Sequence, residues 1–182
     1  MRYQRIRIEG AAYFFTVVTH DRRPILSDRH VVELLHAATE KVRARHPFTI
    51  EAEVVLPDHL HAIWQLPDGD ANFATRWRLI KEYFTRAYVK EHVVPQRSDV
   101  SRWRGGQTVW QRRYWEHLIR DEEDFAAHLD YIHFNPVRHG FVEAAKDWPY
   151  STFCCWVDRG IYEPSWGSGE LPAQPSWASQ VE

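Results

Sequence analysis

The chain has 182 residues, with 44% hydrophobic and 26% charged side chains and a formal net charge of −2. This length suits one domain with a sizeable core, and the nearly neutral charge argues against indiscriminate binding of nucleic acid. The two cysteines, Cys154 and Cys155, are adjacent and cannot form a disulfide framework. No run has the length of a membrane span or the pattern of a signal peptide, so we expect a cytoplasmic protein.

Hydrophobic periodicity and turn residues predict seven elements in the order strand, helix, strand, strand, helix, strand, helix. The predicted ranges are a strand at 13–19, a helix over 31–42 capped by Ser27 or Asp28, strands at 48–56 and 59–66, a helix at 73–93, a short strand within 110–119, and a third helix from Asp121 to Asn135. We expect Pro136 to end that helix, because proline cannot continue a regular helix.

The first six elements are typical of an α+β, ferredoxin-like βαββαβ fold with an antiparallel sheet, to which the third helix is a C-terminal addition. Residues 1–150 are expected to form this domain. Residues 151–182 are expected to be an acidic tail that is partly disordered, chiefly over 167–182. Residues 95–109 carry Pro and Gly-Gly without periodicity, which predicts a loop.

His59 and His61 lie two residues apart in a predicted strand. Because successive strand side chains alternate between faces, both imidazoles project from one face and Leu60 from the other. If Leu60 packs against the first two helices, the imidazoles are available to the third. Two imidazoles on one face can hold a divalent metal that leaves positions open for a substrate oxygen. A pair of ordinary half-buried histidines is the alternative.

Tyr131 and Asn135 are four residues apart in the third predicted helix and share one face. That face lies roughly 100° from the apolar stripe of Phe125, Leu129 and Ile132. Near a metal, a phenol with an ordinary pKa of about 10 can attack a phosphodiester, because the cation offsets the developing charge. The resulting phosphotyrosine keeps the energy needed to rejoin the strand. Alternatively, the tyrosine buries its ring at the helix flank and leaves its hydroxyl in water.

The middle of the chain is basic, with eleven Lys or Arg and four Asp or Glu over residues 76–120, whereas residues from 141 onward are acidic. Over 97–113 the bases alternate with aromatic rings, which suits single-stranded DNA, with phosphates on the cations and bases stacked on the rings. A solvated helix face is the alternative for 76–90. The candidate DNA contacts are Arg102, Arg104, Arg112, Arg113, Trp103 and Trp110, with Arg22 and Arg23 as lesser candidates.

Four segments in order resemble the REP-associated tyrosine transposases, single-tyrosine members of the HUH endonuclease superfamily: VVLPDHLH, WQRRYWEHLIRDEEDF, LDYIHFNPVRHG and DWPYST. The resemblance covers about residues 1–165. It implies a ferredoxin-like domain that cleaves and rejoins single-stranded DNA through a 5′-phosphotyrosine intermediate. The implied substrate is a repetitive extragenic palindrome (REP), a hairpin preceded by a guide tetranucleotide. It favours a monomer and leaves a dimer open.

By position in these motifs, His59 and His61 correspond to a metal-binding pair and Tyr131 to the nucleophile. Asn135 corresponds to a third ligand, whose amide oxygen suits Mg²⁺ or Mn²⁺. An Asn before Pro is also a common helix-ending device. Asp58 can orient an imidazole as a hydrogen-bond acceptor, or serve only the turn that it occupies.

Two other functions remain open from the sequence. A metal-dependent phosphodiesterase would use the same histidines with water as the nucleophile, and a domesticated protein would bind hairpin DNA without turnover. A separate hypothesis concerns the acidic, Trp-bearing tail, which could lie across the basic region and inhibit cleavage in the absence of DNA. Deletion of residues 166–182 is then expected to raise cleavage.

Overall fold

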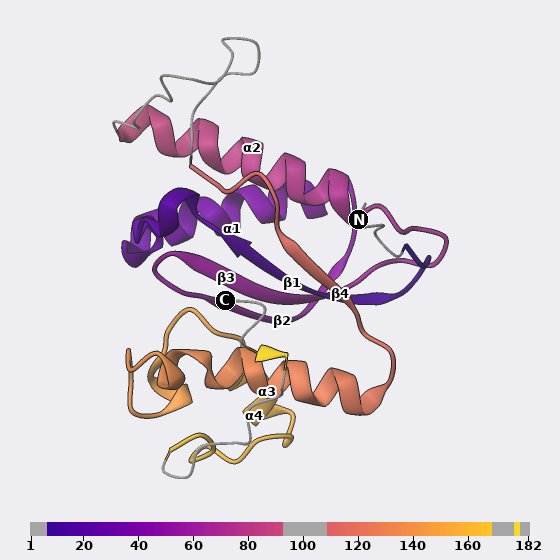
Figure 1. The fold of residues 1–182 in the computed structure, drawn as a ribbon, viewed down its shortest axis with the longest axis vertical. Coiled ribbons are helices and arrows are strands. Elements are labelled where there is room, and N and C mark those ends of the chain that lie inside the picture. Colours follow the sequence, from indigo (N-terminus) through magenta and orange to yellow (C-terminus); the bar gives the residue numbers. More distant parts are fainter. Residues whose placement is uncertain (1–6, 93–108, 169–176, 179–182) are drawn as a thin grey trace.

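The computed structural model describes residues 7–92, 109–168 and 177–178. Its helices and strands are β1 (Ala12–Val18), α1 (Arg29–Arg43), β2 (Thr49–Val55), β3 (His59–Gln65), α2 (Phe73–Glu91), β4 (Trp115–Leu118), α3 (Glu122–Arg138) and α4 (Phe153–Asp158) (Figure 1). Side chains that the sequence marks as caps begin the helices: Asp28 accepts from a first-turn N–H of α1, and Asp121 from one of α3.

The four strands form one antiparallel sheet in the order β2-β3-β1-β4. With the helices, this confirms the predicted α+β, ferredoxin-like βαββαβ fold. The central strands β1 and β3 pair along their whole length, and this register places Thr16 directly opposite His61. Both strands are buried almost throughout, which is why β1 is aromatic and β-branched on both faces.

Helices cover both faces of the sheet: α1 and α2 lie on one side, and α3 with α4 beside it on the other (Figure 1). Two cores result. On the α1/α2 side, Leu60 and Trp64 of β3 are buried, and Trp64 stacks on Trp77 of α2 at 4.0 Å between ring centroids. On the α3 side, Phe14 and Ile63 pack with residues of α3 and α4. The prediction that Leu60 packs against α1 and α2 is confirmed. His59 and His61 therefore project from the opposite face of β3, which α3 covers.

The expectation that Pro136 ends the third helix is wrong. α3 runs through Pro136 to Arg138. Proline removes one N–H from the helical ladder, but the next turn still closes, because the N–H of His139 donates to the carbonyl of Asn135 at 3.0 Å. Gly140 ends the helix instead, with a φ of +71°. The extra residues extend α3 along the sheet and bring two more side chains to the candidate site.

Beyond residue 150 the chain continues to pack on the sheet. Ser151 forms a bridge with Val54 of β2, and Tyr162 is buried in the core under α3. The domain boundary at 150 stays a prediction. Most of the predicted loop at 95–109, and residues 169–176 and 179–182 of the predicted disordered stretch, lie outside the described residues.

Within the described ranges, no helix combines the length and apolar character that a bilayer crossing needs. The expected cytoplasmic location and monomeric state stay predictions.

Candidate active site

His59 and His61 lie buried on the α3 face of β3, 2% and 0% exposed. Their ring centroids are 4.8 Å apart, with the planes at 82°. In both rings Nδ1 is hydrogen-bonded, whereas Nε2 is buried and has no hydrogen-bond partner. Leaving a buried polar atom unsatisfied costs about 1–3 kcal/mol. Two such nitrogens on neighbouring rings suit a ligand that accepts their lone pairs, and a divalent metal is one.

Different groups hold the two Nδ1 atoms. Oδ1 of Asp58 lies 2.6 Å from Nδ1 of His59, and Oγ1 of Thr16 lies 2.8 Å from Nδ1 of His61. A partner on Nδ1 fixes the ring orientation and tautomer, which leaves Nε2 for a ligand. Burial, aided by nearby positive charge, lowers the pKa of His61 well below its ordinary value. The ring is therefore neutral near pH 7, as metal ligation requires.

Asp58 ties this pair to the loop after β1, where Nη1 of Arg22 donates to Oδ2 of Asp58 at 3.0 Å. Burial alone would raise the pKa of Asp58, but hydrogen bonds from His59 and Arg22 lower it to about 2. The carboxylate is therefore ionised at neutral pH. Arg22 adopts a left-handed φ of 49°, which costs a residue with a Cβ about 1–2 kcal/mol. This unfavourable backbone conformation holds a guanidinium beside the histidines.

α3 crosses this face of the sheet and brings Tyr131 against His61. Their ring centroids are 5.1 Å apart with the planes at 72°, and Tyr131 is 2% exposed. One turn further along α3, Asn135 is fully buried, and neither polar atom of its side chain has a hydrogen-bond partner. A buried amide in this state calls for a ligand on its oxygen. The structure thus brings the two histidines and the phenol together and buries the amide one helical turn from the phenol, while their catalytic roles stay predictions.

The continuation of α3 adds Arg138 and His139. The guanidinium carbon of Arg138 lies 5.7 Å from the Tyr131 ring centroid, and the rings of His139 and His59 are also 5.7 Å apart. Sequence reasoning assigned no role to Arg138, His139 or Thr16. For Arg138 a signal existed, because seven residues from Tyr131 is nearly two helical turns. For Thr16 none did, because strand alternation does not reveal which residues pair across strands.

The predicted DNA contacts fall in different places. Residues 102–104 lie outside the described residues. Arg112 and Arg113 are exposed just before β4. Trp110 is half-buried and packs on Phe84 of α2, with ring centroids 5.1 Å apart. Part of its ring is therefore packed against the core and is not open to a DNA base. DNA binding by these residues stays a prediction.

A second group of potential metal ligands lies at the start of α3: His117, Asp124 and His128. Oδ2 of Asp124 already accepts from Nε2 of His117 at 2.8 Å and from two N–H groups of Arg120 at 3.0 Å. The two imidazoles stack nearly parallel, with centroids 4.6 Å apart, and one ligand atom of each of the three side chains lies within 4.8 Å of the others. Nε2 of His128 is buried without a partner, but Trp177 stacks on that ring. We interpret the group as a hydrogen-bonded and stacked support for α3.

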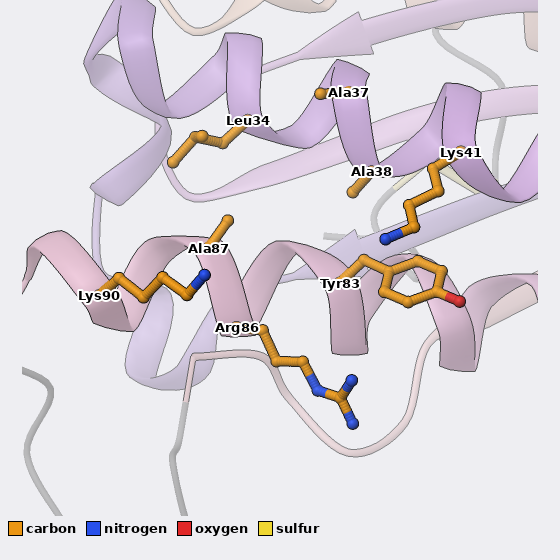
Figure 2. Close-up of a pocket in the computed structure, with 8 residues that line it drawn as sticks. All are labelled: Leu34, Ala37, Ala38, Lys41, Tyr83, Arg86, Ala87 and Lys90. Atoms are coloured by element: carbon orange, nitrogen blue, oxygen red, sulfur yellow. The ribbon is translucent and has the colours of Figure 1, made fainter.

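A groove of about 310 Å³ lies between α1 and α2 (Figure 2). Nζ of Lys41 lies 4.2 Å from the Tyr83 ring centroid there. The residues that line it are Leu34, Ala37, Ala38, Lys41, Tyr83, Arg86, Ala87 and Lys90. These helices cover the face of the sheet opposite to His59 and His61, so the groove is separate from the candidate site.

Comparisons with known proteins agree with this architecture. No family model matches the chain. The REP-associated tyrosine transposase of Escherichia coli (strain K12) is 44% identical over 164 residues, which are 90% of this chain and 89% of the relative. A Haemophilus influenzae protein given the same family name is 43% identical over 165 residues, 91% of this chain and 92% of the relative. A solved structure described as a REP-associated tyrosine transposase bound to a REP hairpin is similar with a TM-score of 0.78 and 40% identity, covering 95% of this chain and 94% of that one.

Proposed function

Since this chain belongs to the REP-associated tyrosine transposases, a family of DNA transposases, we propose that it cleaves and rejoins single-stranded DNA at REP-type hairpins with Tyr131 as the nucleophile. One observation carries the proposal: the Tyr131 ring lies 5.1 Å from that of His61, whose Nε2 is buried without a partner. A nucleophile and a metal-binding nitrogen then share one site, which is what tyrosine attack on a phosphodiester needs.

His59 and His61 would hold the divalent metal through Nε2, and Asn135 through its amide oxygen. This donor set fits a divalent metal, because the three side chains are buried and all of these ligand atoms lack partners, and the amide oxygen is a donor that Mg²⁺ and Mn²⁺ accept. When bound, the cation polarises the phosphate and offsets negative charge in the transition state. Asp58 and Thr16 keep the two rings oriented through Nδ1.

Tyr131 would perform the covalent step. Its Oη forms a bond to phosphorus as the bond from phosphorus to the 3′ oxygen breaks, and the phenolic proton passes to water. The 3′ oxygen leaves with the bonding electrons and takes up a proton. The products are a 5′-phosphotyrosine and a free 3′ hydroxyl. Attack on the phosphotyrosine by a 3′ hydroxyl rejoins the strand without ATP, because the ester bond was exchanged rather than hydrolysed.

The hairpin substrate is inferred from the structural relative, which is described as bound to a REP hairpin. Arg112 and Arg113 are exposed and would contact backbone phosphates, which fix register more than sequence. A guide tetranucleotide beside the hairpin would bring the scissile bond to Tyr131.

The direct test mixes the protein with Mn²⁺ and a single-stranded REP hairpin labelled at its 3′ end, because the 3′ fragment carries the phosphate that tyrosine retains. We expect a protein-linked band on a denaturing gel. Tyr131→Phe should abolish that band. Tyr83→Phe, the same change in the groove between α1 and α2, should leave it unaltered.

Two results would contradict the tyrosine mechanism. Cleavage without linkage that survives Tyr131→Phe would identify a phosphodiesterase that uses water. Retarded mobility on a native gel with no cleavage in Mn²⁺ would identify a hairpin-binding protein without turnover. Matching thermal unfolding of the two variants shows that both are folded.

A further inference from the structure

The stripe of α3 that carries Tyr131 also carries a cation. Tyr131, Asn135 and Arg138 are spaced by four and three residues, so at 100° per residue they lie within about 60° of one another around the helix. The guanidinium carbon of Arg138 is 5.7 Å from the Tyr131 ring centroid. Arg138 is half-buried, which keeps its charge at the edge of the site rather than in bulk solvent.

Arg138 also acts electrostatically on His61. After burial, the positive charges that lower the pKa of His61 include those of Arg138 and Arg22. The two guanidinium groups face different partners. Arg22 donates to Asp58, the carboxylate that orients His59, whereas Arg138 lies over the ring of the nucleophile. A cation in that position is close to any phosphate that the phenol attacks.

We propose that Arg138 is a catalytic residue whose guanidinium binds a non-bridging oxygen of the phosphate attacked by Tyr131. This inference rests on the proposed function and adds a group that the metal-binding histidines and the phenol do not supply. As the bond from Oη to phosphorus forms and the bond to the 3′ oxygen breaks, charge accumulates on the non-bridging oxygens. A planar guanidinium presents parallel N–H donors to such oxygens, and lysine offers only a point charge.

The test compares two substrates in single-turnover assays of adduct formation. One hairpin carries the normal scissile phosphodiester, and the other carries a methylphosphonate, in which a neutral methyl group replaces one charged non-bridging oxygen. Arg138→Gln should slow adduct formation about 10²–10³-fold on the phosphodiester. On the methylphosphonate the same variant should lose only a few-fold, because the charge to be neutralised is gone. Arg138→Lys should be intermediate on the phosphodiester.

Arg86→Gln is the matched control, because it makes the same change of charge on α2, across the sheet from the site. It should leave the ratio of the two rates at the wild-type value. A folding defect in Arg138→Gln would slow both substrates equally, and equal losses would overturn the proposal. Wild-type rates for Arg138→Gln on the phosphodiester would also overturn it. If the wild-type protein forms no adduct through Tyr131, the proposed function fails and the role of Arg138 falls with it.

Discussion

His59 and His61, the proposed metal ligands, project from the same face of β3, but different groups hydrogen-bond to their Nδ1 atoms. Nδ1 of His59 faces the carboxylate of Asp58, which Arg22 shares, whereas Nδ1 of His61 faces the neutral hydroxyl of Thr16. A carboxylate on Nδ1 increases the basicity of Nε2 more than a hydroxyl does. We therefore expect the two rings to contribute unequally to metal affinity. The main contribution of Thr16 is to orient the ring of His61.

Replacement of Thr16 by valine tests that contribution. Valine has nearly the same shape and suits a strand, but it leaves Nδ1 of His61 without its partner. We expect the affinity for Mn²⁺, measured by titration calorimetry, to fall about 10–100-fold. The control is Thr39→Val, which removes a buried hydroxyl that donates to the Leu35 carbonyl within α1. Equal affinities in the two variants would show that Thr16 does not position His61.

Local sequence patterns predict the positions of some of these residues but not of others. Strand alternation is enough to place His59 and His61 on one face, and helical spacing is enough to place Tyr131 and Asn135 together. Thr16 joins the site only through the pairing of β1 with β3, which no local pattern encodes.

At the scale of elements, the described part of the C-terminal segment contacts α3 beside Tyr131, the proposed nucleophile. The Trp177 ring stacks on His128, with centroids 4.0 Å apart, and lies 5.1 Å from the Tyr131 ring. Ala178 is buried next to it. That the acidic tail lies across the basic middle of the chain stays a prediction, and the described Trp177 of this tail contacts α3. A DNA base that approached the phenol from this side would have to displace the Trp177 ring.

We therefore expect Trp177→Ala to accelerate adduct formation on hairpin DNA. Loss of an aromatic contact worth about 0.5–1.5 kcal/mol corresponds to a rate increase of roughly 2- to 10-fold. This point variant is sharper than deletion of residues 166–182, because Trp166 packs on Tyr162 in the core under α3. An unchanged or slower rate in a folded Trp177→Ala protein would refute inhibition by the tail.

The course of α3 shows where prediction from local sequence stops. Its start at Asp121 and its buried stripe follow from capping and periodicity. Its passage through Pro136 does not, because the packing of the surrounding helix on the sheet outweighs one missing hydrogen bond. That outcome adds Arg138 and His139 to the site.

At the scale of the whole molecule, helices cover both faces of the sheet. Several histidines are buried as a result, and burial favours their neutral form. Burial lowers the pKa of His128 to about 4 and that of His133 to about 3, from an ordinary value of 6.5. Between pH 6.5 and these values, the unfolded chain binds protons that the folded chain does not. Stability is therefore lost as the pH falls through this window, by up to about 1.4 kcal/mol per pH unit for each histidine.

Replacement of His128 by asparagine should flatten that dependence. The asparagine amide can still donate to the Asp124 carbonyl, as Nδ1 of His128 does at 2.7 Å, but it does not titrate. We expect the free energy of unfolding, from urea titrations at several pH values, to fall less steeply between pH 6.5 and 4 than in the wild type. Parallel curves for the two proteins would mean that His128 does not carry this proton linkage.

The proposed function depends on the contact between α3 and β3, which brings Tyr131 to the histidines. The most direct test is to identify the residue to which the DNA becomes covalently attached. The covalent product formed in Mn²⁺ would be digested, and the residual nucleotide located on the protein by tandem mass spectrometry. We predict attachment at Tyr131, and no attachment when His59 and His61 are both replaced by alanine. Attachment at another residue, or undiminished attachment in the double variant, would contradict this mechanism.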